Sequence, residues 1–440
     1  MTMKLRNRLI ALVCLFLFLA LGAFLLLTSS TRKPFAIILF VGDNITSPVL
    51  GATRIFNGGA EARLHMEELP YSALSRNAAN AVSIPDTASA STQISAGRRV
   101  NKGSLCIDTA GLKLSSLLEL ASLKGRATGL ITTGEITGTT AASYYAKTLS
   151  GENRSDLALQ FCSHPPFDFV AGGGSLDFES PEATSTNLPP SVDTNSSSQV
   201  VAGSPLKKMK DHGVSVLHSV AELEKQPFWK KNPLLALLSP GPLSPLSATG
   251  STEGDPSAPS LSDLVRIAIR NLQSNGQGYL LVVDDPMIGQ AARSNDAETM
   301  FQRILAFDKA ISTARRYAGE KALVVVTGRE TLGGLQLSGY PFLRDKGVAV
   351  LAINNQGYPS LNWSTGPGFD PDKGADLSHS KKTFGTNSSV GILLQPSATK
   401  LPSGLGVGGD VLTLGVGPGS ENLHGFQDLT QVHRLILNEL

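Results

Sequence analysis

A threonine at the expected start of a helix is the first residue of this chain that could carry out chemistry. Pro85 and Asp86 precede Thr87, and both residue types suit a helix entrance. Small residues follow up to Gly97, so the helix could pack closely while its positive end faces an anion. Thr87 is therefore a candidate hydroxyl nucleophile at a phosphate site. Taken alone the motif is a weak signal, because ordinary helices with small residues and a Thr cap are common.

The chain around this segment alternates buried strands with helical stretches, which predicts an α/β layered fold. At 440 residues it is long enough for one large domain or two smaller ones. Strands are expected at Ala36–Val41, Thr128–Thr132, Asp168–Ala171, Leu234–Leu238, Tyr279–Val283 and Ala322–Val326. Helices are expected at Leu114–Leu123, Leu261–Gln273 and Ala297–Ala318.

Composition narrows the class of partner. The net charge is +2 and charged residues make up 17%, so the chain lacks the basic excess that is typical of nucleic-acid-binding proteins.

The chain contains three cysteines. Cys14 lies in an apolar run, whereas Cys106 and Cys162 could either pair outside the cytoplasm or stay as buried free thiols.

The N-terminal segment predicts a membrane anchor. Residues 1–8 contain three basic side chains and form an expected cytoplasmic segment. Residues 9–27 are an uncharged apolar run of about 28 Å as a helix, near the hydrocarbon thickness of a bilayer. Because residues 28–31 offer no clear cleavage site, we favour an uncleaved anchor with the main domain periplasmic or extracellular. A cleaved signal and a secreted chain are the alternative.

Five segments in order resemble the alkaline phosphatase family. They are a first strand ending in an acidic residue, the nucleophile segment, the next strand and turn, a strand–acidic turn–long helix–strand unit, and a C-terminal signature. These are FAIILFVGD (35–43), residues 82–108, GLITTGEITGTTAASYYA (129–146), residues 279–335 and GPGSENLHGFQD (417–428).

The resemblance implies a three-layer sandwich over residues 34–440, with a large, mostly parallel sheet and helices on both faces. Residues 178–204 and 240–259 are rich in Ser, Pro and Thr and are interpreted as surface insertions. Residues 340–408 are expected to form an irregular cap. The family also implies a homodimer.

Family members use two zinc ions and one magnesium ion around a Ser or Thr nucleophile. The resemblance places Thr87 at the nucleophile position. It places Asp43, Thr140 and Asp284 at the magnesium-type corner, where Asp284 is one methylene shorter than the family's Glu. Two carboxylates and a hydroxyl, with waters, are adequate ligands for magnesium.

The zinc ligands of the family are replaced here. Gly289, Arg293 and Gly406 stand where the first zinc ion needs an Asp and two His residues. Arg329 and Glu330 stand in place of the Asp-His pair of the second zinc ion, which leaves Glu330 as a weak ligand.

The phosphate-binding arginine of the family also has no match in register. Gly151 occupies its place, and Arg154 follows three residues later.

These replacements predict a protein whose metal site is degenerate. We expect it to be inactive or strongly impaired as a phosphatase, with magnesium but not zinc as the metal it could hold. Arg293 and Arg329 would supply positive charge for a phosphorylated or other anionic ligand. Two alternatives remain: an active phosphomonoester hydrolase using Thr87 and a reduced metal set, and an interaction protein with no site.

Overall fold

The computed structural model describes residues 11–22, 35–59, 61–163, 167–179, 205–227, 232–243, 260–337, 351, 359–368 and 395–440. Most of the two predicted insertions, part of the predicted cap and the segment 1–8 lie outside these residues. Residues 11–22 are helical, and no described helix is long and apolar enough to cross a membrane.

A ten-stranded sheet forms the centre of the described structure, in the order β13-β2-β12-β8-β1-β7-β3-β4-β6-β5. Among the described pairings of this ten-stranded sheet, only β12 runs antiparallel to its neighbours. The strands are β1 (Ala36–Gly42), β2 (Tyr71–Arg76), β3 (Ala127–Glu135), β4 (Phe169–Gly173), β5 (Ser215–Leu217), β6 (Leu234–Leu237), β7 (Tyr279–Asp285), β8 (Leu323–Gly328), β12 (Val411–Val416) and β13 (Phe426–Asp428).

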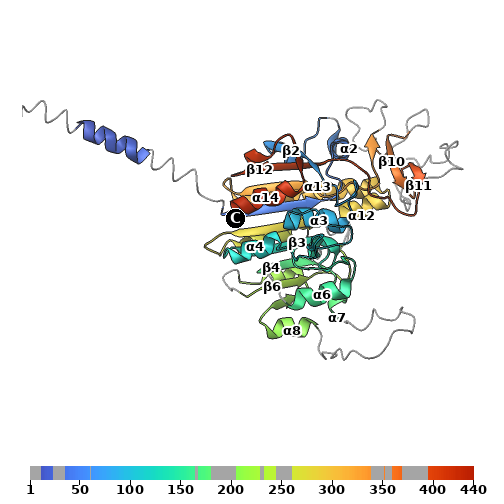
Figure 1. Cartoon of the computed structure of the whole chain (residues 1–440), viewed down its shortest axis with the longest axis horizontal. Helices are drawn as coiled ribbons and strands as arrows, with labels where there is room; N and C mark the ends of the chain where they lie inside the picture. The colour runs from blue at the N-terminus through green and yellow to red at the C-terminus, as the bar shows by residue number, and fades with distance from the viewer. Residues whose placement is uncertain are drawn as a thin grey trace, which may run out of the picture.

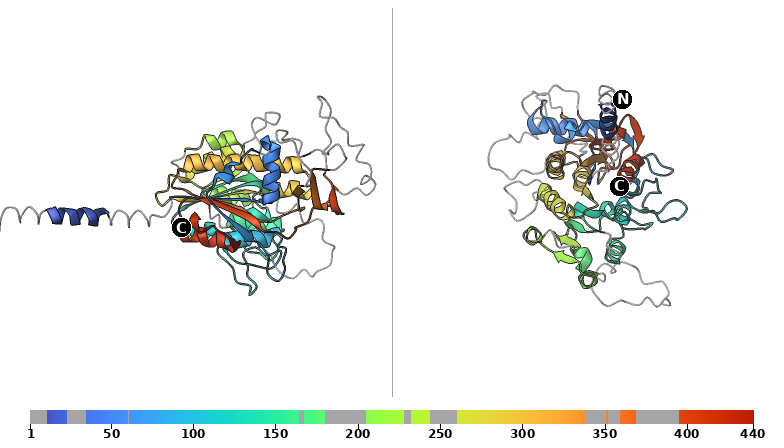
Figure 2. Two further views of the ribbon diagram at one scale, coloured as in Figure 1. Left: turned by 90° about the horizontal axis from the view of Figure 1, so that it is seen from above. Right: turned by 90° about the vertical axis from the view of Figure 1, so that its left-hand side faces the viewer.

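Helices cover both faces of this sheet (Figures 1 and 2). The longer ones are α2 (Ser47–Gly58), α3 (Thr87–Ala96), α6 (Arg154–Ser163), α11 (Leu261–Leu272), α13 (Ala297–Ala318) and α14 (Thr430–Glu439). The shorter ones are α4 (Leu117–Leu123), α5 (Thr139–Ala142), α7 (Leu176–Glu179), α8 (Pro205–Asp211), α9 (Val220–Glu224) and α12 (Met287–Arg293).

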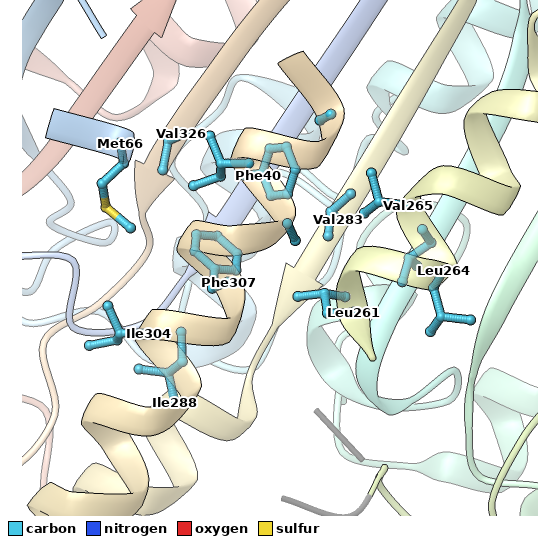
Figure 3. Close-up of a cluster of buried hydrophobic side chains, with 14 of the residues drawn as sticks. Phe40, Met66, Leu261, Leu264, Val265, Val283, Ile288, Ile304, Phe307 and Val326 are labelled. Atoms are coloured by element: carbon cyan, nitrogen blue, oxygen red, sulfur yellow. The ribbon is translucent and has the colours of Figure 1, made fainter. Parts of the chain in front are cut away.

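The central strand β1 shows why both faces are covered. Every residue of β1 is buried, which is typical of a parallel strand packed on both sides. Ile38 and Phe40 belong to the hydrophobic cluster under α2, α11 and α13, part of which Figure 3 shows. Ile37 and Leu39 belong to the opposite cluster under α3, α4, α6 and α14. The three-layer sandwich predicted from the sequence is confirmed.

All six predicted strands and all three predicted helices are present. The helix predicted from residue 114 begins only at Leu117, because the Ser116 side chain caps it by accepting a hydrogen bond from the Glu119 N–H. A small three-stranded sheet is formed by β9 (Gln336–Leu337), β10 (Leu361–Gly366) and β11 (Ser397–Lys400), of which the last two strands lie within the residues predicted to form the irregular cap. Cys106 and Cys162 are both buried, and they are not joined to each other by a disulfide bond.

Candidate functional site

Three adjacent parallel strands bring the candidate site together at their carboxyl ends. Asp43 directly follows β1, Arg329 directly follows β8, and Asp284 lies near the end of β7. In the register of the sheet, Gly42 of β1 pairs with Gly328 of β8 on one side and with Asp285 of β7 on the other. Functional side chains in open α/β sheets gather at this edge.

The guanidinium of Arg329 bridges the two carboxylates. Its Nε and Nη2 donate to the two oxygens of Asp43, at 3.0 and 2.8 Å. Its Nη1 donates to Oδ1 of Asp284 at 2.9 Å. The side chains of Arg329 and Asp284 are 1% exposed and that of Asp43 is 4% exposed, so this is a buried charge cluster.

The remaining oxygen of Asp284 is also in use. The hydroxyls of Thr140 and Thr132 both donate to Asp284 Oδ2, at 2.5 and 3.3 Å. Asp43, Thr140 and Asp284 therefore converge, as the magnesium site predicted from the sequence requires. However, a metal ion needs free carboxylate lone pairs, and the position between the two carboxylates is filled by Arg329.

As arranged in this structure, the side chains around Asp43 and Asp284 leave no open position for a metal ion. Within the described part of the chain, no group of three or more His, Cys, Asp or Glu side chains could hold a metal ion. The sequence predicted Arg329 as a ligand for phosphate. The structure instead places it against Asp43 and Asp284.

Burial dominates the electrostatics of the cluster. Desolvation raises the pKa of Asp43 to about 7, although Arg329 acts in the opposite direction. Burial would lower the pKa of Arg329, but the nearby charges of Asp43, Asp284 and Glu330 outweigh it and raise that pKa above its ordinary value. The bidentate contact on Asp43 fits the carboxylate form, because both of its oxygens accept N–H bonds.

Thr87 lies at the start of α3, as the sequence predicted. Asp86 caps this helix, since its side chain accepts hydrogen bonds from the Ser89 N–H and from the Gly103 N–H. The helix ends at Gly97, which adopts the left-handed conformation that favours glycine. The Asp86 cap at the start of α3 and the left-handed Gly97 at its end hold the helix in place, and this fixes where the Thr87 hydroxyl points.

The hydroxyl of Thr87 donates to Glu330 Oε1 at 2.6 Å. Arg293 Nη2 lies 3.5 Å from the same hydroxyl and 4.0 Å from Glu330 Oε1. Glu330 is buried, whereas the Arg293 side chain is 34% exposed. Glu330 therefore contacts the candidate nucleophile directly.

These side chains open into a pocket of about 220 Å³. Thr87, Arg293, Glu330 and Asp43 line it, and so does Arg154 at the start of α6. Arg154 pairs with Glu135 at 2.7 Å and with Asp177 at 3.5 Å, yet half of its side chain is exposed. The register of the family motif does not place Arg154 at the phosphate site, but the loop before α6 brings it to the pocket. Nothing in the sequence beyond the presence of an arginine nearby indicates this position.

Gly289, on α12, has a steric reason to lack a side chain. A Cβ at this position would lie 2.2 Å from Asp43 Oδ2. The Asp43 carboxylate therefore occupies the space that a ligand side chain at position 289 would need. Gly406 lies close to the start of α3, where a Cβ would be 3.6 Å from the Pro85 carbonyl oxygen.

A hydroxyl at a helix start, facing a charged pocket at the carboxyl ends of a parallel sheet, defines a phosphatase-like α/β architecture. A family model described as "Alkaline phosphatase" matches residues 36–440. The chain belongs to the alkaline phosphatase family.

Individual relatives agree. The chain is 26% identical over 445 residues to "Alkaline phosphatase" of Gadus morhua, which covers 91% of this chain and 90% of the relative. It superposes on the alkaline phosphatase of Thermus thermophilus with a TM-score of 0.70 at 19% identity, covering 93% and 92% of the two chains. A mutant of the alkaline phosphatase TAB5, solved with Mg bound in its M3 site, matches with a TM-score of 0.65 at 19% identity over 93% of this chain and 98% of that one. At this identity the structural matches establish the fold alone.

Proposed function

We propose that this chain is a non-hydrolytic member of its family that keeps an anion pocket. The observation that carries the proposal is the Arg329 guanidinium, which holds three of the four carboxylate oxygens of Asp43 and Asp284. Hydrolysis by this family requires metal ions to activate the hydroxyl and to generate hydroxide near pH 7. An arginine keeps its protons and cannot replace that chemistry.

The pocket supports anion binding through its outer residues. Arg293 and Arg154 are both partly exposed, and both line the pocket with Thr87. A guanidinium is well suited to phosphate, sulfate or carboxylate. The inner carboxylate of Glu330 opposes this attraction, so we expect weak affinity for a dianion and better affinity for a singly charged group.

The direct test is hydrolysis of an aryl phosphate by the purified full chain, with zinc and magnesium added and then removed by a chelator. We expect no turnover at a rate typical of the family in either condition. Metal analysis of the same sample should show no stoichiometric zinc. Zinc-dependent turnover that disappears in Thr87→Ala would establish the alternative, an active phosphomonoesterase, and end this proposal.

We also propose that the domain functions outside the cytoplasm. Support comes from the basic residues 1–8 and the uncharged apolar run 9–27. A reporter fused after residue 440 that is active only outside the cytoplasm would agree with this orientation, and one active only inside would contradict it.

A further inference from the structure

We propose that Arg329 is a built-in cation that fastens three strand ends together, and that removing its side chain uncovers a latent magnesium site of Asp43, Asp284 and Thr140. The inference rests on the proposed function, since it explains how the chain keeps its buried carboxylates without the metals of its family. It concerns the stability of the fold, so it is measured without any assay of activity.

The first argument is charge. Asp43 and Asp284 are both buried, and two buried carboxylates without a counter-charge strongly destabilise a fold. Arg329 is the cation in contact with both of them in the described structure. Its planar fork supplies three donors to two carboxylates at once, a geometry that a flexible ammonium cannot match.

The second argument is position. The Arg329 backbone N–H donates to the Gly42 carbonyl, and the Asn77 side chain donates to the Arg329 carbonyl. These contacts fix the backbone of Arg329 at the end of β8. Its side chain then passes the end of β1 and reaches Asp284 on β7. One guanidinium therefore connects β8, β1 and β7, which are consecutive in the sheet.

The third argument is steric complementarity. The Asp43 carboxylate that accepts from Arg329 passes within 2.2 Å of where a Cβ of residue 289 would lie. A side chain at 289 would therefore push the Asp43 carboxylate out of its present contact with Arg329. The absence of a ligand side chain at 289 and the presence of an arginine at 329 therefore depend on each other, because both determine where the Asp43 carboxylate can lie.

The ligands left behind by such an exchange are still in place. Without the guanidinium, Asp43 and Asp284 would present open oxygens to the same point, with the Thr140 hydroxyl beside them. Two carboxylates, a hydroxyl and waters suit magnesium, which keeps several of its own waters. The variant Arg329→Ala should therefore bind a cation that the natural chain has no room for.

A second buried arginine provides a matched control. Arg303 is 1% exposed and lies 3.6 Å from Asp285, which is fully buried. This pair differs from the first because Arg303 faces a single carboxylate. Arg303→Ala should lower stability through the same loss of a buried counter-charge, but it leaves too few ligands to hold magnesium.

The experiment compares the melting temperature of the full chain and its variants in a chelator and in millimolar magnesium chloride. The natural chain should melt at the same temperature in both. Arg329→Ala should melt well below it in chelator and recover part of that loss with saturable magnesium dependence. Arg303→Ala should melt lower with no recovery. A magnesium-dependent natural chain, or equal responses of the two variants, would overturn the inference.

Two further outcomes are decisive. An Arg329→Ala chain that melts like the natural one, or that stays unfolded even in magnesium, contradicts the latent site. If Arg329→Ala stays unfolded, Arg329→Lys tests the role of the built-in cation alone. A melting temperature equal to that of the natural chain would contradict the need for a guanidinium fork. A lower melting temperature that does not respond to magnesium would support it. Hydrolysis by the natural chain would instead refute the proposed function.

Discussion

At the scale of single residues, the tightest constraint is at Gly289. Alanine is normally the better residue inside a helix, by about 1 kcal/mol. In α12, however, the added Cβ would overlap Asp43 Oδ2, an oxygen already held by Arg329. We expect Gly289→Ala to destabilise the fold by about 1–3 kcal/mol, as overpacking does. Chemical denaturation measures this.

Gly51 is the control for that substitution. It also lies inside a helix, α2, but a Cβ there would meet nothing closer than 3.7 Å. Gly51→Ala should therefore be neutral or slightly stabilising. If the two variants lose the same stability, the contact between Gly289 and Asp43 has no special role.

Glu330 is the residue expected to control affinity for anions. Its carboxylate accepts the Thr87 hydroxyl and lies near Arg293, where a bound phosphate would also lie. Two like charges 4 Å apart repel by about 4 kcal/mol at the effective dielectric of a protein surface. We expect Glu330→Gln to strengthen phosphate binding by about tenfold or more, because tenfold needs only about 1.4 kcal/mol. Calorimetric titration of inorganic phosphate measures it.

The double variant Arg293→Ala, Glu330→Gln tests whether tighter phosphate binding comes from the removed negative charge or from an enlarged pocket. If Arg293 holds the anion, the double variant should lose the affinity that Glu330→Gln gains. Binding that survives in the double variant would place the anion elsewhere.

Much of the residue set could be predicted from the sequence, but its arrangement could not. Asp43 and Asp284 lie close together because the ends of adjacent parallel strands meet, and Thr140 reaches Asp284 from α5. The direction of Arg329 could not be predicted, because an arginine beside carboxylates can face either the carboxylates or an anion. Burial decides: two desolvated carboxylates are a stronger partner than a solvated ligand.

At the scale of elements, the interior strands are predictable and the edges are not. Strands such as β7 are continuous apolar runs, which stand out from their surroundings. The strand β2 is short and partly exposed, and β13 has three residues, so neither carries a clear periodicity. β12 is not predicted from the sequence for a related reason, since it lies in a Gly-rich stretch with little hydrophobic periodicity.

The contact between α3 and α14 makes stability depend on pH. His433 of α14 is buried, and its Nδ1 donates to the Ser95 carbonyl of α3 at 3.1 Å. Burial lowers the pKa of His433 below 6.5, its ordinary value, although the hydrogen bond to Ser95 opposes this. As the pH falls below about 6.5, His433 takes up its proton in the unfolded chain before it does so in the folded chain. The folded chain therefore loses stability as the pH falls from about 6.5.

We therefore expect His433 to contribute a loss of stability between about pH 7 and pH 5, of at most about 1.4 kcal/mol per pH unit, whereas the raised pKa of Asp43 acts in the opposite direction in all variants. His433→Asn keeps an N–H donor near Ser95 but cannot take up the proton, so it should flatten the profile. His424 is exposed, and His424→Asn should leave the profile unchanged. An equal profile in all three chains would exclude His433 as the cause.

At the scale of the whole molecule, the sandwich is organised by two hydrophobic clusters on opposite faces of one sheet. The alternating pattern of strands and helices predicts that plan, because each strand covered on both faces needs helices on both sides. If the proposed function is correct, the same plan explains how the chain keeps its fold without the metal ions of its family. The two clusters contain the hydrophobic core. The site lies at the edge of the sheet, where the buried carboxylates need only a positive charge beside them.

The segment of residues 11–22 is separate from that core. Its helix leaves large apolar side chains exposed, with Phe16 and Phe18 at 72% and 73%, and Figure 1 shows it apart from the sandwich. The buried structure begins with β1 at Ala36. We therefore expect a chain of residues 35–440 to melt within about 2 °C of the full chain, a difference that corresponds to less than about 1 kcal/mol. Scanning calorimetry of the two chains measures this.

The same exposed helix predicts different behaviour toward lipid. The full chain should co-sediment with phospholipid vesicles and the 35–440 chain should not, because the uncharged run of residues 9–27 can enter a bilayer. Phe16→Lys combined with Leu19→Lys should reduce this binding without changing the melting temperature, since a charge in the hydrocarbon is costly and both residues lie outside the core. Equal sedimentation of the full chain and the double variant would mean that the apolar run does not mediate the attachment.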